Sequence, residues 1–99
     1  MSCAAPAGGV STAGRDLSRE SVIQGVVTRS GECVGGAYVR LLDSSGEFAA
    51  EVPTNDAGEF RFFAVPGTWT VRTLAAGAPP VDRTVKAQQG AVAEVRVAV

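Results

Sequence analysis

The middle of the chain carries two short units, each a tight turn that leads directly into a strand-like run. The first passes from the turn Thr54–Gly58 into Glu59-Phe60-Arg61-Phe62, and the second passes from Pro66-Gly67 into Thr68-Trp69-Thr70-Val71. In both runs a large apolar side chain stands at every second position, which is the pattern of a strand with one buried face. Short strands joined by tight turns are typical of an all-β sandwich, so we expect this chain to be built from strands.

The same alternation recurs about every 10 to 15 residues from Ser21 onward, with turn-forming residues between the repeats. No segment shows a helical period. The strand around Arg83 alternates poorly, and we therefore predict that it lies at the edge of a sheet. The seven predicted strands are Val22–Thr28, Ala37–Leu42, Ala49–Thr54, Glu59–Phe63, Thr68–Ala75, Val81–Lys86 and Ala91–Val99.

Alternation also predicts which side chains form the core, and 99 residues are enough for one core of this kind but not for two. Residues 21–99 are therefore expected to form a single β-sandwich domain. Residues 1–20 are rich in Ala, Gly, Ser and Pro, and we predict that they form a flexible tail. The predicted inward-facing residues are Ile23, Gly25, Val27, Ala37, Val39, Leu41, Phe60, Phe62, Trp69, Val71, Val95, Val97 and Val99.

Composition argues against several kinds of chemistry. The chain has no histidine, which is the commonest general base and a common metal ligand. Its serines have no base to accompany them, so a hydrolase triad is not supported. The net charge of −1 offers no basic excess to attract nucleic acid or anionic lipid. We therefore predict a protein that is not an enzyme, binds no cofactor or metal, and contacts neither nucleic acid nor a membrane.

The only two cysteines are Cys3 and Cys33, fewer than a small disulfide-stapled secreted domain normally carries. Met1–Glu20 contains no apolar stretch of signal-peptide length, and no segment approaches a membrane span. These features predict a cytoplasmic protein with reduced thiols and an inert loop cysteine at position 33. The flexible tail makes a Cys3–Cys33 disulfide geometrically possible, but a cytoplasmic setting argues against that bond.

Three arginines are predicted to point outward from the middle of their strands. If those strands are neighbours, the arginines form a row suited to carboxylate, sulfate or an acidic partner surface. Tyrosine, phenylalanine and leucine share the same outward parity, and such a mixture is typical of protein interfaces. The alternative is a solvated face whose arginines pair with Glu51, Glu59 or Glu94. The interface candidates are Tyr38, Arg40, Arg61, Phe63, Arg72 and Leu74, with Leu42 on the same parity.

Four short motifs resemble the carboxypeptidase regulatory-like, or transthyretin-like, domain superfamily. The resemblance covers about residues 21–99 and implies a seven-stranded Greek-key β-sandwich. Its motifs consist of core and turn residues, so they indicate a fold rather than an activity. They are Ile23/Gly25/Val27, Gly36-Ala37-Tyr38-Val39-Arg40-Leu41, Gly58/Phe60/Phe62 and Pro66-Gly67-Thr68-Trp69-Thr70-Val71.

The segments 39–48 (VRLLDSSGEF) and 60–64 (FRFFA) are similar to a small actinobacterial family associated in mycobacteria with sulfur metabolism. Genes of that family typically neighbour a thiosulfate sulfurtransferase of the rhodanese type. The resemblance therefore implies a non-catalytic accessory protein in sulfur metabolism whose partner is such a sulfurtransferase. A cysteine within the first few residues is a feature of the family, and Cys3 occupies that place here.

Two other functions remain open at this point. Cys3 is a candidate sulfur acceptor, since a thiol on a mobile tail can enter a partner's active site and accept a persulfide. That reaction needs a thiolate, but the nearest cation in the sequence is Arg15, so the partner would have to supply the positive charge. The other possibility is a structural interaction module unrelated to sulfur. The sequence does not select an oligomeric state.

Overall fold

A computed structural model describes residues 21–99 of the chain. All seven predicted strands are present, and each bound lies within one residue of its prediction. The predicted count of seven is nevertheless wrong, because β2 forms an eighth strand that is too short to show alternation. The strands are β1 (Ser21–Arg29), β2 (Glu32–Cys33), β3 (Tyr38–Leu42), β4 (Phe48–Pro53), β5 (Glu59–Ala64), β6 (Gly67–Leu74), β7 (Val81–Ala87) and β8 (Val92–Ala98).

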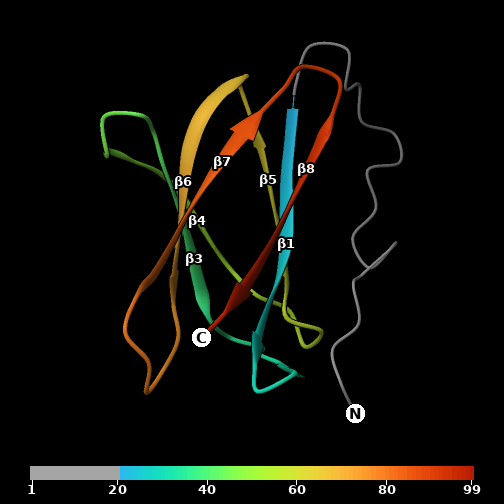
Figure 1. The fold of residues 1–99 in the computed structure, drawn as a ribbon, viewed down its shortest axis with the longest axis vertical. Coiled ribbons are helices and arrows are strands. Elements are labelled where there is room, and N and C mark those ends of the chain that lie inside the picture. Colours follow the sequence, from blue (N-terminus) through green and yellow to red (C-terminus); the bar gives the residue numbers. More distant parts are fainter. Residues whose placement is uncertain (1–20) are drawn as a thin grey trace.

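The strands form two four-stranded sheets. In sheet A, β1 pairs with β5 and β2 along one edge and with β8 along the other, whereas sheet B has the order β4-β3-β6-β7. The β1–β8 pair is parallel and every other pair is antiparallel. In the view of Figure 1, the strands of sheet B lie to the left of β1, β5 and β8. The strand around Arg83, β7, is at the end of sheet B as predicted; the Greek-key connectivity stays a prediction.

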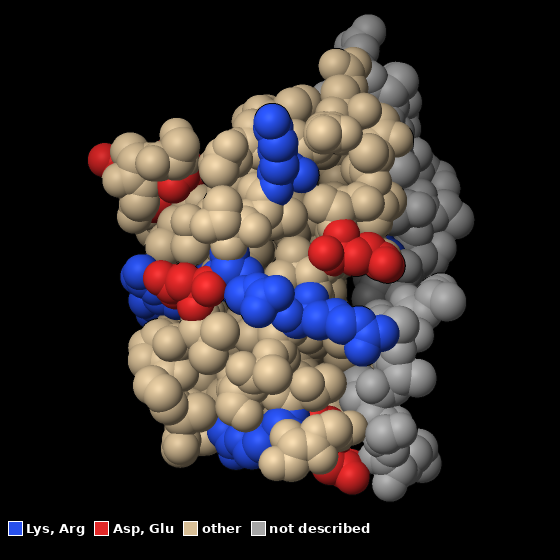
Figure 2. Space-filling model, viewed as in Figure 1, with Lys and Arg blue, Asp and Glu red and all other residues tan. Residues whose placement is uncertain are grey.

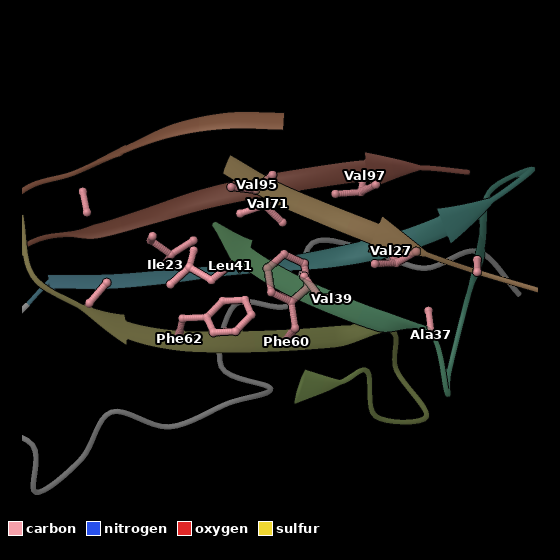
Figure 3. Close-up of a cluster of buried hydrophobic side chains, with 13 residues drawn as sticks. Ile23, Val27, Ala37, Val39, Leu41, Phe60, Phe62, Val71, Val95 and Val97 are labelled. Carbon is pink, nitrogen blue, oxygen red and sulfur yellow. The ribbon is translucent and has the colours of Figure 1, made fainter. Parts of the chain in front are cut away.

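One apolar cluster fills the space between the sheets (Figure 3). Both sheets contribute to it, and the rings of Phe60 and Phe62 lie at its centre with centroids 6.0 Å apart. Trp69 and Val99 are half-buried against the cluster, and the indole Nε1 of Trp69 donates a hydrogen bond to the Val65 carbonyl at 3.0 Å. The predicted members that are buried in the cluster are Ile23, Val27, Ala37, Val39, Leu41, Phe60, Phe62, Val71, Val95 and Val97.

Gly25 is the inward position of β1 that carries no side chain, and close packing explains why. A Cβ at this position would lie 2.0 Å from the Val95 carbonyl oxygen and 2.7 Å from the Phe60 ring. Phe60 is the cross-strand neighbour of Gly25 on β5. The ring therefore lies over the glycine and occupies the space that a side chain of β1 would need.

Thr54, which follows β4 in sheet B, is hydrogen-bonded to the segment that connects β2 of sheet A to β3. Its buried hydroxyl Oγ1 accepts a hydrogen bond from the Ala37 N–H at 3.0 Å and donates one to the Val34 carbonyl at 2.7 Å. The backbone of Thr54 makes two further bonds, donating to the Ala37 carbonyl at 2.8 Å and accepting from the Gly36 N–H at 3.1 Å. One side chain thus fixes the entry into β3 and with it the register of the outer face of sheet B.

Candidate protein-docking face

The outer face of sheet B presents its side chains in rows that run across the strands. In the first row Tyr38 of β3 lies between Pro53 of β4 and Leu74 of β6. Tyr38 is 52% exposed, whereas Leu74 is half-buried. Two of the predicted interface residues, Tyr38 and Leu74, are therefore neighbours, as the alternation indicated.

The second row consists of four charged residues in the order acid, base, base, acid. Glu51, Arg40, Arg72 and Asp82 are successive cross-strand partners on β4, β3, β6 and β7. The Nε of Arg40 donates a hydrogen bond to the Glu51 carboxylate at 2.6 Å. Arg72 holds Asp82 in a bidentate pair, with bonds of 2.9 and 3.0 Å.

This pairing decides what the charged row can bind. The hydrogen bonds from Arg72 lower the pKa of Asp82, and the same contact raises the pKa of Arg72. Each arginine has its own carboxylate, so the row carries no net charge. The alternative with Arg40 paired to Glu51 is confirmed, while Asp82, the partner of Arg72, was missed because it lies on the poorly alternating strand.

Basic and acidic side chains also lie next to each other elsewhere on the surface. Figure 2 shows basic side chains in a band across the middle of the visible face, with acidic side chains beside them. The presence of both signs on the visible face fits the net charge of −1.

A third row places Phe48 beside Leu42, where a register shift between Leu41 and Leu42 interrupts the β3–β4 ladder. Leu42 is buried although its parity is outward, while Phe48 is 62% exposed. Sequence reasoning did not select Phe48, because it follows the turn at Gly46 and lies just outside the predicted strand. An aromatic residue directly after a turn was the signal that could have identified it.

The structure does not bring Arg61 and Phe63 together with the other four candidates. Both lie on β5, which pairs with β1 in sheet A, so they belong to the opposite outer face. The Nε of Arg61 donates a hydrogen bond to Gln24 at 3.4 Å, and its guanidinium carbon lies 5.8 Å from the centre of the Phe63 ring. The predicted single row of three arginines is therefore wrong. Alternation reports the two faces of one strand, but it does not report which sheet the strand joins.

On the outer face of sheet A, the middle strand is buried. Val22 is 0% and Val26 is 1% exposed, although both point away from the core cluster that contains Ile23 and Val27. The flanking side chains in the row of Val22 are more open, with Phe63 at 39% and Val92 at 40% exposure. In the row of Val26, by contrast, Glu59 of β5 is also buried, at 5% exposure, so the buried part of this face extends beyond β1.

Cys33 forms a disulfide, so the prediction of a reduced, inert loop cysteine is wrong. The residue lies on β2 opposite Thr28, at the end of β1 remote from Ser21. The other half of the bond is not among residues 21–99. Cys3, the candidate sulfur acceptor, likewise lies outside the described residues.

Neither a metal centre nor a membrane span is found in the part of the chain that the structure describes. Residues 21–99 contain no group of three histidine, cysteine or acidic side chains placed to hold a metal ion. Within the same range no helix is long and apolar enough to cross a membrane. The absence of a cofactor and of catalytic activity stays a prediction from composition.

Comparison with solved structures places this fold among known β proteins. The minor pilin of Streptococcus agalactiae superimposes with a TM-score of 0.67 and 12% identity, over 81% of this chain and 44% of the pilin. The dioxygenase domain of a carbohydrate-binding fusion protein from Streptomyces sp. SirexAA-E gives a TM-score of 0.64 and 10% identity, over 91% of this chain and 84% of that domain. At such identities the likeness concerns the fold alone.

Sequence comparison gives much closer relatives in mycobacteria. An uncharacterised protein of Mycobacterium tuberculosis strain H37Rv is 50% identical over 97 residues, which cover 96% of each chain. An uncharacterised protein of Mycolicibacterium smegmatis is 65% identical over 63 residues, or 63% of this chain and 70% of that relative. The family model described as "Protein of unknown function (DUF1416)" matches residues 3–99, and the chain therefore belongs to this family.

Proposed function

We propose that this protein is a non-catalytic accessory protein that docks a protein partner on the outer face of sheet B. The observation that carries the proposal is the exposure of Tyr38, 52%, in a row with Leu74 and directly beside the Arg40–Arg72 pair. Tyrosine and arginine are enriched among the residues that dominate binding energy at protein interfaces. The docking face is defined here as Tyr38, Arg40, Arg72, Leu74 and Phe48.

The supporting backbone suits this role. The docking face lies on four hydrogen-bonded strands, and β3, which carries Tyr38, is a central strand of that sheet. Thr54 fixes the entry into β3 through the two hydrogen bonds of its hydroxyl. A face held in this way loses little conformational freedom on binding, so a larger share of the contact energy appears as affinity.

The partner we propose is a thiosulfate sulfurtransferase of the rhodanese type, in a sulfur-metabolism setting. This step rests on the resemblance of residues 39–48 and 60–64 to the actinobacterial family whose genes neighbour such an enzyme. The mycobacterial relatives agree with the actinobacterial part of that resemblance. The competing functions are a sulfur carrier that accepts a persulfide on Cys3 and an interaction module unrelated to sulfur.

Isothermal titration calorimetry of the full chain against the proposed rhodanese-type sulfurtransferase tests the proposal. We expect Tyr38→Ala to weaken binding at least about tenfold, since truncated aromatic hot spots cost about 2 kcal/mol or more. The control is Val92→Ala, because Val92 is 40% exposed and lies on β8, in sheet A rather than in the sheet that carries the docking face. Equal affinity of Tyr38→Ala and wild type would contradict docking on this face, and no binding by wild type would contradict the choice of partner.

Intact mass after incubation with the sulfurtransferase and thiosulfate separates docking from sulfur transfer. An accessory protein keeps its mass and still forms the complex, and Cys3→Ser leaves the affinity unchanged. A gain of one sulfur atom that disappears in Cys3→Ser would instead identify a carrier. A complex with other proteins and none with any sulfurtransferase would favour the unrelated module.

A further inference from the structure

Strand β8 pairs on one side only within residues 21–99, in an uninterrupted parallel ladder with β1. At the two ends of this ladder, the Val22 N–H donates to the Ala91 carbonyl at 3.1 Å and the Val99 N–H donates to the Thr28 carbonyl at 2.8 Å. Because backbone groups alternate between the two sides of a strand, the odd-numbered residues of this stretch face β1. The residues whose backbone groups point away from β1 are Val92, Glu94, Arg96 and Ala98.

The outer side of β8 is accessible to solvent. The four residues that point away from β1 all have exposed side chains. In the part of the chain that the structure describes, their backbone groups bond to no other strand, because the neighbouring edge strand β7 pairs with β6 alone. An edge of this kind can receive one more strand through main-chain hydrogen bonds.

The other sheet edges carry features that oppose such pairing, and β8 does not. The ladder of β4 is interrupted by a register shift, and that strand ends at Pro53, which has no N–H to donate. On β7, Arg83 and Lys86 place two like charges on the edge. On β5, the backbone N–H and carbonyl of Glu59 are already bonded by Asn55. By contrast, β8 contains no proline, glycine or lysine and no register shift.

We propose that β8 is a homodimer interface, where the β8 strands of two copies of this chain pair antiparallel across a two-fold axis. The two A sheets then form one continuous sheet. A two-fold axis at right angles to a sheet edge makes the two edge strands antiparallel. The inference is independent of the docking proposed for sheet B, because β8 belongs to the other sheet.

The two charged residues of β8 point to a second copy as the occupant. Glu94 and Arg96 are exposed and lie on the same outer face, on either side of the buried Val95. Neither forms a salt bridge within residues 21–99. Glu94 accepts a hydrogen bond of 3.4 Å from the amide of Gln24, and the neighbour of Arg96 on β1 is the apolar Val26. The strand therefore carries one acid and one base that are free to pair with each other's copies.

These charges also select the register. In an antiparallel pair, residues that direct their backbone groups toward the partner strand oppose one another and exchange two hydrogen bonds. With the two-fold axis at Val95, Glu94 of each copy lies opposite Arg96 of the other, and Val92 lies opposite Ala98. Moving the axis to Glu94 would set two glutamates opposite each other, and moving it to Arg96 would set two arginines opposite each other. Opposite charges in direct cross-strand pairs are stabilising and like charges are destabilising, so the register centred on Val95 is favoured.

The size of the contact predicts a reversible dimer. One strand from each copy makes the interface, so the buried area is expected to fall below the about 1,200 Å² at which stable complexes begin. Sedimentation of the full wild-type chain should therefore show a mass that rises with concentration from 10.1 kDa toward twice that value. A mass that stays at 10.1 kDa up to millimolar protein would overturn the proposal.

Charge reversal tests the strand and its register. Glu94→Arg and Arg96→Glu each turn two attractive pairs into two repulsive ones, and we expect either to raise the dimer dissociation constant at least about tenfold. Mixing the two variants should restore association, because the first chain carries two bases on this edge and the second carries two acids. Glu47→Arg is the matched control, since Glu47 is exposed in the turn before β4 and its reversal changes the net charge equally.

Two outcomes of the reversal experiment would contradict the proposal. If both variants dimerise as well as wild type, the interface is not at β8. If each variant is monomeric and their mixture is monomeric too, the register centred on Val95 is wrong. Restored association in the mixture also shows that both variants are folded, so a loss of dimer in the single variants cannot be attributed to unfolding.

Hydrogen exchange of the backbone amides gives a second, independent measurement. The N–H groups of Glu94 and Arg96 point away from β1, so they should exchange at least about tenfold more slowly in concentrated than in dilute wild-type protein. The N–H groups of Val95 and Val97 face β1 and serve as the internal reference. Equal exchange of the Glu94 and Arg96 amides at both concentrations, in a sample that sediments as a dimer, would place the contact elsewhere and overturn the assignment to β8.

Discussion

The outer faces of the two sheets have the same alternating pattern in sequence and opposite relations to solvent. On sheet A the central outward residues, Val22 and Val26, are at most 1% exposed, while on sheet B Tyr38 is 52% and Phe48 62% exposed. Apolar side chains that point outward are therefore buried on one sheet of this small sandwich and exposed on the other. The outward valines of sheet A are buried, whereas the outward aromatic side chains of sheet B are open to solvent.

The polar residues differ between the two faces in a corresponding way. On sheet B each arginine has a carboxylate in its own row, with Arg40 on Glu51 and Arg72 on Asp82. On sheet A Arg61 contacts the amide of Gln24 and lies near the Phe63 ring. The face proposed to meet a partner thus carries its charges already neutralised, which lowers the cost of removing them from water.

Replacing Gly25 tests the packing beneath sheet A and should have the largest effect. We expect Gly25→Ala to cost about 3 kcal/mol of unfolding free energy, since the new Cβ meets the Val95 carbonyl at 2.0 Å. Gly46, in the turn that leads into β4 of sheet B, is the matched control: it has φ +87° and open space around it. Gly46→Ala should cost about 1 kcal/mol from backbone strain alone. Urea unfolding of both variants gives the comparison, and equal costs would contradict it.

A pair of truncations tests the contrast between the outer faces directly. Val26→Ala should cost about 2 kcal/mol, because it removes two methylene-sized groups from a fully buried site. Tyr38→Ala should change the unfolding free energy by no more than about 0.5 kcal/mol, because its ring is half in solvent. Urea titrations of the full chain measure both. A smaller loss for Val26→Ala than for Tyr38→Ala would remove the distinction between a covered and an open face.

Thr54 extends the comparison, because its hydroxyl connects the segment between β2 of sheet A and β3 to the sheet that carries the docking face. Thr54→Val should cost about 1–2 kcal/mol, since the buried Ala37 N–H loses its bond to the hydroxyl and the Val34 carbonyl loses its donor. Thr84→Val is the control, because Thr84 is exposed on β7 and should tolerate the change. Thermal unfolding reports both, and similar midpoints would show that the hydroxyl does not hold the junction.

The smallest expected effect is an acid dependence carried by sheet B. Hydrogen bonds from Arg72 lower the pKa of Asp82, and hydrogen bonds from Ser45 and the nearby backbone lower that of Asp43. A depressed folded pKa stabilises the protein fully above the ordinary value of 3.8 and loses that contribution as the pH falls through the folded value. Asp82→Asn should therefore be less stable than wild type near neutral pH, and the difference should shrink well below pH 3.8. A constant difference in the urea midpoint would contradict this assignment.

The strands and the core could be predicted from the sequence, because both depend on local patterns. Alternation placed Phe60, Phe62, Val71 and Val95 in the cluster, and turn residues set every strand end to within one position. The two-residue β2 was missed because a strand of that length has no period to detect.

The candidate site was predicted only in part, because sheet membership is set by long-range pairing. Tyr38, Arg40, Arg72 and Leu74 share one face, as expected, since β3 and β6 are neighbours. Arg61 and Phe63 do not, because β5 joins β1 across 37 residues of sequence at the Gln24–Arg61 pair. The alternation of a strand likewise does not indicate that Val22 is buried or that Cys33 forms a disulfide.

The self-neutralised row on sheet B has a kinetic consequence. A row that reads acid, base, base, acid produces a field that cancels within a few ångströms, so it cannot draw a partner in from a distance. Association through this face should proceed at the unsteered rate of about 10⁵–10⁶ M⁻¹s⁻¹ and change little with ionic strength. Selectivity among partners would then come from how long each complex survives rather than from how quickly it forms.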